Sequence, residues 1–509
     1  MSNLDPAQPL AEDCIVSESV MPSGQLPPMR SRPLPEAIPL RKMLGPSMIL
    51  AGLALGSGEF VLWPYITYQS GFVFFWACLL GVTTQYYINM EITRWSLATG
   101  ESAITGFARL SKHWAWVFLF LNIVPWMIPA WGTGAAEIVT WLAWGVEGEG
   151  AQYVIPLSIA SLVVCGLILT AGKVVYDTVE RVQMVLVLLV LVLVVLLAGW
   201  LLFAEGRVDA VSALLAGSVN FGGVPDSENL GAVMLLGALA FAGVGGTLNL
   251  GQSNYVKDKG YGMGKYIGRI TSPITGQEEA ISEVGYHFPH DQENLARWRT
   301  WWRAASLEHF LSFFLTCLVC IVLLTLIAYC LFFQADGSPT VGADQFGSGM
   351  GFIWAQSLEL ESLLGTSLVR FLFLGMGVAI LLTTEFGVLD AATRISTDIV
   401  KVNWLRDSKL WTESRLYYVF LWGLIALGTT ILIYGHKDLG TLGLFKYTAA
   451  MNGGVMFLYS GLLLYVNRFK LPAAVRMSAP RAAIMVWAVL FFGYFAVWAI
   501  VHVLSQAGE

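Results

Sequence analysis

One carboxylate stands out because it lies in the middle of a long apolar segment. Glu59 directly follows Gly56, Ser57 and Gly58, about halfway along a hydrophobic stretch at about 44–69. A charged side chain at the centre of a bilayer costs roughly 2.5–3.5 kcal/mol on insertion scales, so it must be protonated, paired, or facing water or a cation. Two roles stay open for this side chain. It is either a ligand for a cation or proton, or a protonated cap for free backbone donors.

A second run of glycines interrupts a later apolar segment. Gly243, Gly245 and Gly246 are followed by Thr247 and Asn249. Each glycine lowers helix stability by about 1 kcal/mol, so both runs predict unwound backbone within a span. Such backbone is tolerated at membrane depth only where it lines a cavity in the protein. Close packing of small residues is the other explanation, but it does not account for the carboxylate beside the first run.

The composition predicts that these interrupted segments cross a membrane. The chain has 509 residues, of which 56% are hydrophobic and 13% are charged, whereas a soluble protein carries roughly 25% charge. A helix needs about 20 apolar residues to span a bilayer. We therefore predict an all-α polytopic membrane protein. Its eleven transmembrane helices are expected at about 44–69, 72–98, 113–142, 153–172, 179–204, 229–255, 305–334, 365–399, 413–435, 443–467 and 482–505.

The positions of the two glycine runs predict an internal repeat. They fall in spans one and six, which are the first helices of two successive groups of five. Because five is odd, the second group would be inverted, and paired broken helices in inverted halves mark the binding site of a transporter. This 5+5 inverted repeat assigns 42–204 to the first repeat, 205–228 to an extracytoplasmic loop, 229–467 to the second repeat, and 468–509 to the eleventh helix and the C-terminus.

The distribution of Lys and Arg predicts the orientation. If the N-terminus is cytoplasmic, only Arg207, Arg370, Lys437 and Lys446 of the 29 basic residues lie outside, as the positive-inside rule expects. The proline-rich residues 1–41 predict a disordered cytoplasmic tail. Residues 256–303 predict a cytoplasmic loop that ends in an interfacial helix, because Trp298, Trp301 and Trp302 alternate with arginines. We expect the inner membrane of a bacterium.

Several short motifs resemble the NRAMP family of divalent-metal transporters, which have the LeuT fold. The resemblance extends from Gly45 to the tenth span. Gly45-Pro46 is followed after nine residues by 56–59, where the family has Asp-Pro-Gly-Asn. The spacing of Asn89, Arg94, Thr99 and Gly100 is similar to the end of the family's second helix. Residues 133–137 and 242–248 stand where the family has Thr-Asp-x-Ala-Glu and Ala-x-x-Met-Pro-His-Asn.

The resemblance implies a secondary active transporter of divalent cations, with its metal site at the two breaks. By position, Glu59 replaces the family's Asn ligand and Ala242 supplies a backbone carbonyl, so these two are the expected metal ligands. Gly56 replaces the Asp ligand, and Gly245 replaces the Met ligand. Thr247 and Asn249 complete the expected binding set. Oxygen donors without a thioether favour hard ions such as Mg²⁺ or Mn²⁺.

Coupling to protons is less clearly implied, because Gly134 replaces the third-helix Asp of the family's proton route. Glu137, Glu385 and Asn89 are the residues we expect on a path for protons or a coupling ion. Each of the two carboxylates has a structural alternative as a hydrogen-bonded interior group. No cofactor is expected beyond the transported cation and protons.

Other classes of function find little support. The chain has no phosphate-binding loop and no H-E-x-x-H, so we do not expect an enzyme. Its net charge of −6 and lack of a basic stripe argue against nucleic acid as a partner. Cys317 and Cys320 lie in an apolar run and are interpreted as packing residues. The main alternative is a LeuT-fold, cation-coupled symporter of a small organic solute such as an amino acid, with Trp63, Trp126 and Trp131 lining an aromatic pocket.

Overall fold

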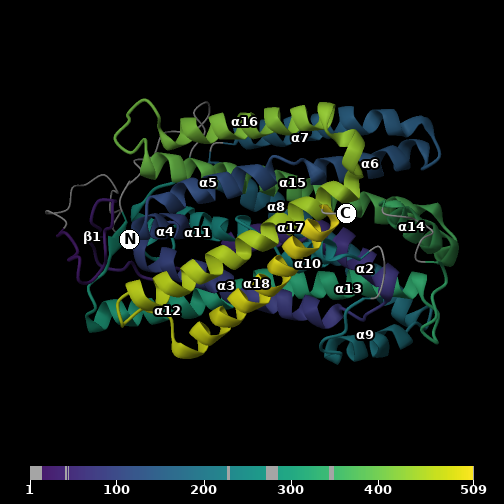
Figure 1. The fold of residues 1–509 in the computed structure, drawn as a ribbon, viewed down its shortest axis with the longest axis horizontal. Coiled ribbons are helices and arrows are strands. Elements are labelled where there is room, and N and C mark those ends of the chain that lie inside the picture. The colour runs from purple at the N-terminus through teal and green to yellow at the C-terminus, as the bar shows by residue number, and fades with distance from the viewer. Residues whose placement is uncertain are drawn as a thin grey trace.

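The protein is built almost entirely of helices (Figure 1). The computed structural model describes residues 14–507 apart from 40–42, 44, 173, 226–229, 271–284 and 343–348. Within these residues the strands are β1 (Arg30–Ser31) and β2 (Tyr286–His287), which form one short parallel pair. The all-α fold class predicted from the sequence is therefore confirmed.

Each predicted span corresponds to a helix or to an interrupted pair of helices. In chain order they are α1 (Pro46–Ala54) with η2 (Gly58–Leu62) and α2 (Trp63–Ser70), α3 (Phe75–Thr99), α5 (His113–Trp126) with α6 (Ala130–Trp144), α7 (Val154–Ala171), α8 (Val175–Phe203), α10 (Ala232–Ala240) with α11 (Leu248–Asp258), α12 (Gln292–His309) with η5 (Phe310–Leu315) and α13 (Thr316–Phe332), α15 (Ser367–Asn403), α16 (Glu413–Tyr434), α17 (His436–Tyr465) and α18 (Ala479–Ala507).

Nine of these stretches in the described part of the chain are long and apolar enough to cross a membrane on length and composition alone. The other two are α3, which carries Glu91 and Arg94 in its 25 residues, and the pair α10 and α11, which is divided by the second glycine run. Polar residues and breaks lower the apparent hydropathy of the helices that line a site. The chain is a multi-pass membrane protein.

Span three is interrupted, which the sequence analysis did not anticipate. α5 contains Pro125 and ends at Trp126, and α6 starts only after Pro129. A proline removes a backbone donor and clashes with the preceding turn, so it ends or bends a helix. The interruption turns two tryptophans, Trp126 and Trp131, toward the centre of the molecule, where both are buried.

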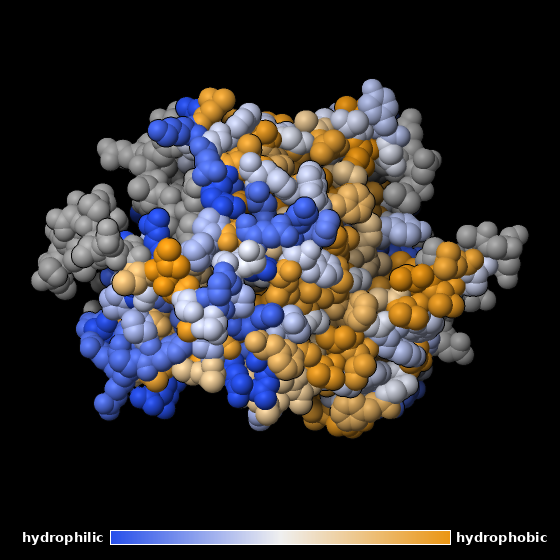
Figure 2. Space-filling view, turned by 60° about the vertical axis from the view of Figure 1, so that its left-hand side comes forward, coloured by the Kyte–Doolittle hydropathy of each residue, from blue (hydrophilic) through white to orange (hydrophobic). Residues whose placement is uncertain are grey.

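The helix at the centre of the packing is α15. It packs against α1, α5, α6, α8 and α16 (Figure 1). From Thr383 to Ile399 its residues are buried on every side. Helices α7, α8, α16 and α18 instead expose many large apolar side chains, and hydrophobic residues cover much of the right-hand part of the face drawn in Figure 2. These exposed surfaces suit contact with lipid.

Shorter elements lie at the ends of the spans. They are α4 (Ala103–Leu110), η3 (Glu149–Tyr153), α9 (Asp209–Val219), η4 (Gly262–Tyr266), α14 (Gly351–Leu364) and η6 (Val466–Lys470). The N-terminal segment lies at the same end as α4 and α12, and the C-terminal end of α18 lies toward the end with α2 and α14 (Figure 1). An odd number of spans places the two ends of the chain toward opposite ends of the molecule.

The described part of the N-terminal tail corrects the expectation of disorder. Residues 14–39 lie against the loops at this end, with Met21, Met29 and Leu34 buried. The amide of Leu34 donates to the Asn294 side chain over 2.8 Å. The prolines prevent helix formation, but backbone carbonyls between them accept hydrogen bonds from other elements. Residues 1–13 lie outside the described part.

The described part of 256–303 is also more tightly packed than an interfacial helix would be. Helix α12 forms as expected, but Trp298 and Trp301 face inward and are buried. The indole nitrogen of Trp301 donates to the carbonyl of Pro35 over 2.8 Å. These tryptophans therefore anchor the tail and do not face the bilayer. The boundaries of the two repeats and the side of the membrane for each terminus stay predictions.

Candidate functional site

The two glycine runs meet inside the molecule. α1 ends at Ala54, and the chain resumes as a π-helical turn, η2, at Gly58. A Cβ atom at Gly58 would lie only 1.6 Å from the carbonyl oxygen of Phe241, at the start of the second break. In that break Gly245 and Gly246 have φ of 77° and 56°, which glycine adopts at little cost. Both predicted breaks are confirmed, and their backbones touch.

A very small cavity, of about 10 Å³, lies at this crossing. Three of its walls are aromatic: the ring centroids of Trp126 and Trp131 are 5.6 Å apart, and both lie near Phe241, at 6.1 and 5.8 Å. Ser57 and Thr384 contribute hydroxyl groups. The other lining residues are Leu53, Ala54, Gly58, Gly243, Val244, Leu248 and Val388. The cavity therefore offers aromatic faces and a few neutral oxygens.

Glu59 is not among the residues that line this cavity. Its side chain is 0% exposed, and within the described residues neither carboxylate oxygen has a hydrogen-bond partner. It lies within electrostatic range of the thiols of Cys78, Cys317 and Cys320 on α3 and α13. The described residues contain no metal-binding cluster of three His, Cys, Asp or Glu side chains.

Gln85 on α3 forms hydrogen bonds with the unwound backbone of the second break, a role that was not predicted from the sequence. Its amide nitrogen donates to the carbonyl of Ala240 over 2.8 Å, and its amide oxygen accepts from the Gly245 amide over 3.3 Å. The same oxygen accepts from Asn249. Unwound backbone in an apolar interior needs such partners. A polar residue in mid-span was the available signal, but Asn89, one turn later, was singled out instead, for a path of protons or a coupling ion.

A second polar link connects spans three, six and eight. The indole nitrogen of Trp126 donates to the Thr247 hydroxyl over 2.7 Å, and that hydroxyl donates to Asn122 over 2.7 Å. The Asn122 amide in turn donates to the carbonyl of Ala392 over 2.8 Å. Thr247 therefore positions the aromatic wall of the cavity from behind. Asn122 was also missed.

The remaining predicted binding residues are spread around the two breaks. A Cβ at Gly56 would meet the Thr384 hydroxyl at 2.6 Å, and the Ala242 methyl group lies toward Gly81 on α3. Asn249 donates to Tyr459 over 3.0 Å. At Gly245 a Cβ would lie 2.4 Å from the Phe241 ring. Together with its positive φ, this leaves no room for a methionine-like ligand in this conformation.

The three residues predicted for a coupling path have different surroundings. Glu385 accepts a hydrogen bond of 3.0 Å from the Gly132 amide in the first turn of α6, where an acidic group is stabilised by the helix dipole. Glu137 is partly buried and lines a larger cavity, of about 570 Å³, with Trp141, Met350 and Thr441. Asn89 is buried, and both its amide atoms lack partners within the described residues.

The end of the molecule that holds the N-terminal segment is closed by buried ion pairs. Arg394 on α15 contacts Asp258 at the end of α11, and its Nη2 lies 2.8 Å from Asp390. Lys257 lies 3.0 Å from Asp398. All five side chains are buried. They join α11, which follows the second break, to the central helix.

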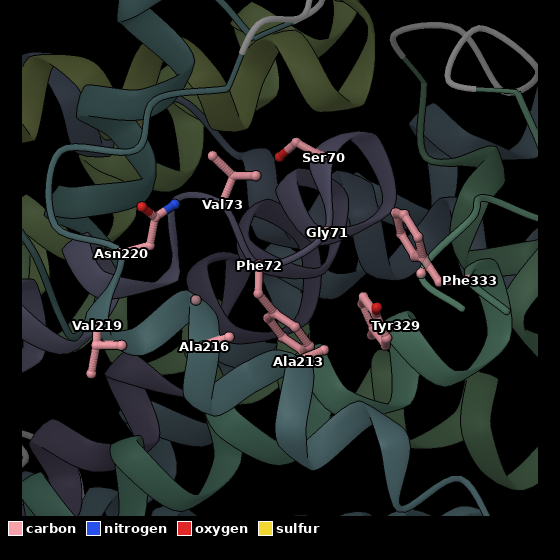
Figure 3. A pocket seen from close by; sticks show the side chains of 12 residues that line it. Ser70, Gly71, Phe72, Val73, Ala213, Ala216, Val219, Asn220, Tyr329 and Phe333 are labelled. Carbon is pink, nitrogen blue, oxygen red and sulfur yellow. The ribbon is translucent and has the colours of Figure 1, made fainter. Parts of the chain in front are cut away.

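A further cavity of about 620 Å³ lies at the opposite end, between the turn after α2, helix α9 and the end of α13 (Figure 3). Phe72, Tyr329 and Phe333 form its aromatic side, and Asn220 is one of its few polar groups. It contains no ionisable carboxylate or amine among its lining residues. It is therefore a weaker candidate for a cation site than the crossing of the breaks.

In this architecture two broken helices cross beside a small central cavity. Solved structures of the manganese transporter of Eremococcus coleocola are similar to this chain. One, of a histidine-to-alanine variant, has a TM-score of 0.63 at 11% identity and covers 95% of this chain and 90% of that chain. Another, in complex with an aromatic bis-isothiourea substituted compound, has a TM-score of 0.62 at 11% identity and covers 97% and 91%.

At this level of identity the likeness shows the fold. The chain has the fold of the NRAMP-type manganese transporter, which is the LeuT fold, as the sequence motifs predicted. The solved structures it resembles are transporters and not enzymes. A scan against models of known protein families finds no match, and a search of curated protein sequences finds no relative.

Proposed function

We propose that the chain transports a divalent metal cation across the membrane by secondary active transport, with Glu59 as the charged ligand. The observation that carries the proposal is the isolation of this carboxylate, which is fully buried at the first break and has no side-chain partner and no counter-charge in the described residues. A buried charge without a partner is strongly unfavourable. A bound cation supplies the missing partner, and a proton supplies it when no cation is bound.

The groups around the breaks that could coordinate a metal favour a hard ion. The sulfur ligand of the family is absent at Gly245, and the available groups are hydroxyls such as Ser57 and backbone carbonyls such as that of Ala242. Oxygen ligands favour Mg²⁺ or Mn²⁺. The thiols of Cys78 and Cys317 are soft donors within electrostatic range of Glu59, so binding of Cd²⁺ reports directly on whether they take part.

Exchange of a proton for a metal ion at Glu59 would couple the transport of the metal to the transport of protons. A carboxylate that is protonated when empty must release its proton to bind a metal. Glu137 in the outer cavity is well placed to collect cations, and the unpartnered Asn89 offers a polar step within the membrane. We assign Glu385 a structural role at the start of α6, because its carboxylate is engaged by the Gly132 amide.

The setting of this activity follows from the same arguments. We propose the plasma membrane of a bacterium, with the N-terminus in the cytoplasm, because nearly all Lys and Arg residues would then lie inside. Neither an enzymatic cofactor nor a nucleic acid forms part of the proposal.

The test compares wild type with Glu59→Gln, which keeps size and hydrogen bonding but removes the charge. Purified wild-type protein should melt at a higher temperature with Mg²⁺ or Mn²⁺, because a ligand that binds only the folded state stabilises it. Glu59→Gln should lose this shift, and uptake into proteoliposomes should fall by orders of magnitude.

Glu149→Gln in the exposed turn η3 is the matched control and should behave as wild type. Uptake by Glu59→Gln at the wild-type rate would remove the proposal. Stabilisation by Cd²⁺ far above that by Mg²⁺ or Mn²⁺ would contradict the preference for hard ions.

The second candidate is a symporter for a small organic solute. The aromatic walls of the central cavity favour it, because Trp126, Trp131 and Phe241 resemble the surroundings that proteins use to bind organic cations. A panel of amines and amino acids in the same melting assay separates the two candidates. Stabilisation by one of these solutes that is lost in Trp131→Leu, without any response to divalent ions, would favour the symporter.

A further inference from the structure

A strongly basic surface lies where α12 meets the turn that precedes α18. Its cations come from α3, α12, η6, the turn that follows η6 and the start of α18. We refer to them together as the basic surface: Arg94, Arg299, Arg303, Arg468, Lys470, Arg476 and Arg481. The carboxylate among them is Glu91, which is buried and already bonded to Arg94 and Arg481. The whole chain has a net charge of −6, so this concentration of positive charge is local.

Contacts between the elements hold these cations together. The Nη1 of Arg94 donates to the carbonyl of Val475 over 3.0 Å, and that of Arg468 donates to Met477 over 2.9 Å. Arg94 and Arg481 lie over the same indole ring, that of Trp302, at 4.0 and 5.0 Å from its centroid. Figure 1 shows the turn between α17 and α18 beside α12.

Much of this positive charge is not neutralised by the protein. Arg299, Arg303 and Arg476 are exposed and form no ion pair or hydrogen bond through their side chains with the described residues. The Nη2 of Arg481 is buried and also lacks an acceptor within them. Like charges held close together repel each other, and the surface is most stable with an anion bound.

The position along α18 places this surface at the level of lipid headgroups. The apolar stretch of α18 starts at Ala479, so Arg481 lies in its first turn. Trp487 follows about 9 Å further along the helix axis, and both Trp487 and Leu490 are exposed on the outer surface. Tryptophans of this kind mark the boundary between headgroups and acyl chains. Arg481 itself faces α3, but on α12 the exposed Arg303 is followed on the same face of the helix by the exposed Leu307 and Phe310. An anion bound at Arg303 therefore has apolar surface directly beside it.

We propose that the basic surface binds the phosphate headgroup of an anionic phospholipid in the leaflet on the N-terminal side. Free inorganic phosphate would satisfy the arginines but would leave the exposed apolar surface beside Arg303 unused. A lipid satisfies both, with its phosphate on Arg303 and its acyl chains along Leu307 and Phe310. Basic pockets between membrane helices recognise anionic headgroups in this way. The inference does not depend on which solute the chain transports.

The test measures lipid retained by the purified full-length protein. Protein in neutral detergent is titrated with phosphatidylglycerol or with phosphatidylcholine, and bound lipid is counted by native mass spectrometry. Wild type should prefer phosphatidylglycerol by at least about tenfold. Each basic residue near an anionic headgroup contributes roughly fivefold to binding. The triple variant Arg299→Gln, Arg303→Gln, Arg476→Gln should therefore weaken binding by about 100-fold.

A matched control removes the same charge elsewhere on this side of the protein. Arg406→Gln, Lys409→Gln and Arg415→Gln alter the loop between α15 and α16 and the start of α16, and should leave the preference unchanged. None of the residues changed in either variant forms an ion pair within the described part of the chain, so both variants should fold. Arg481→Lys, which keeps the charge but not the planar donor group, should weaken binding without removing it.

Three results would overturn the proposal. Equal losses in both triple variants would mean that only diffuse surface charge attracts the lipid. Displacement of phosphatidylglycerol by millimolar inorganic phosphate would identify a site for the free anion. A change in the mass of the protein particle between wild type and the first triple variant, without a change in lipid binding, would show that this surface joins two copies of the chain.

Discussion

Replacing Gly58 with alanine tests whether the two broken helices touch. The added Cβ would lie 1.6 Å from the carbonyl oxygen of Phe241 and 2.7 Å from its carbonyl carbon. Ordinary contacts between carbon and a carbonyl oxygen are about 3.3 Å, so one backbone must move by about 1.7 Å. Forced overpacking costs typically 1–3 kcal/mol. Because backbone cannot rotate away as a side chain can, we expect about 3 kcal/mol here.

The assay is thermal unfolding of the purified protein, combined with uptake into proteoliposomes. Gly58→Ala should melt several degrees below wild type and transport poorly, because the cavity walls separate along with the breaks. Gly454→Ala in α17 is the control. Its Cβ would meet nothing within 4 Å, and alanine favours a helix over glycine by about 1 kcal/mol. A melting temperature and an uptake rate equal to those of wild type in Gly58→Ala would show that the contact does not form.

Three further perturbations follow from the same structure. Gln85→Leu leaves the Ala240 carbonyl and the Gly245 amide unpaired, at about 1–3 kcal/mol each, so its melting temperature should fall. Gln85→Glu keeps the acceptor, so its melting temperature should fall less. Arg394→Met leaves two buried aspartates without a counter-charge and should cost about 3–5 kcal/mol; a melting temperature equal to wild type would show that the pairs do not form. Burial lowers the pKa of His287 to about 4, from 6.5. The unfolded chain then binds more protons between these values, so stability falls as the pH drops from 7 to 5, by about 2 kcal/mol. His287→Asn should remove this part of the pH dependence in melting curves recorded across that range.

The sequence predicted the spans and two breaks because both have local causes. A run of about 20 apolar residues is long enough to cross a bilayer wherever it occurs, and glycines such as Gly245 weaken a helix in any context. The third interruption had an equally local cause in Pro125 and Pro129. It was missed because the surrounding run is apolar on average, and hydropathy alone cannot separate a bent span from a straight one.

The site was harder to predict because it depends on which faces of the helices meet. The position of Glu59 in the chain identified it as unusual. It did not show that the side chain lies apart from the central cavity. Gln85 and Asn122 act on residues more than 100 positions away, and no local pattern encodes such contacts. The tail was mispredicted for a related reason: its prolines exclude a helix, yet its carbonyls remain free to accept bonds such as that from Trp301.

The contact between Gly58 and Phe241 also determines how easily the broken helices can move past each other. Where side chains interlock, motion requires rotamers to disengage, and each step passes over a barrier. Here a bare Cα rests against a carbonyl oxygen, and no side chain of Gly58 stands between the two strands of backbone. Because only backbone atoms meet, this contact resists compression between the two breaks but resists sliding or tilting very little. This geometry allows the helical segments on either side to tilt while the contact between the breaks stays in place.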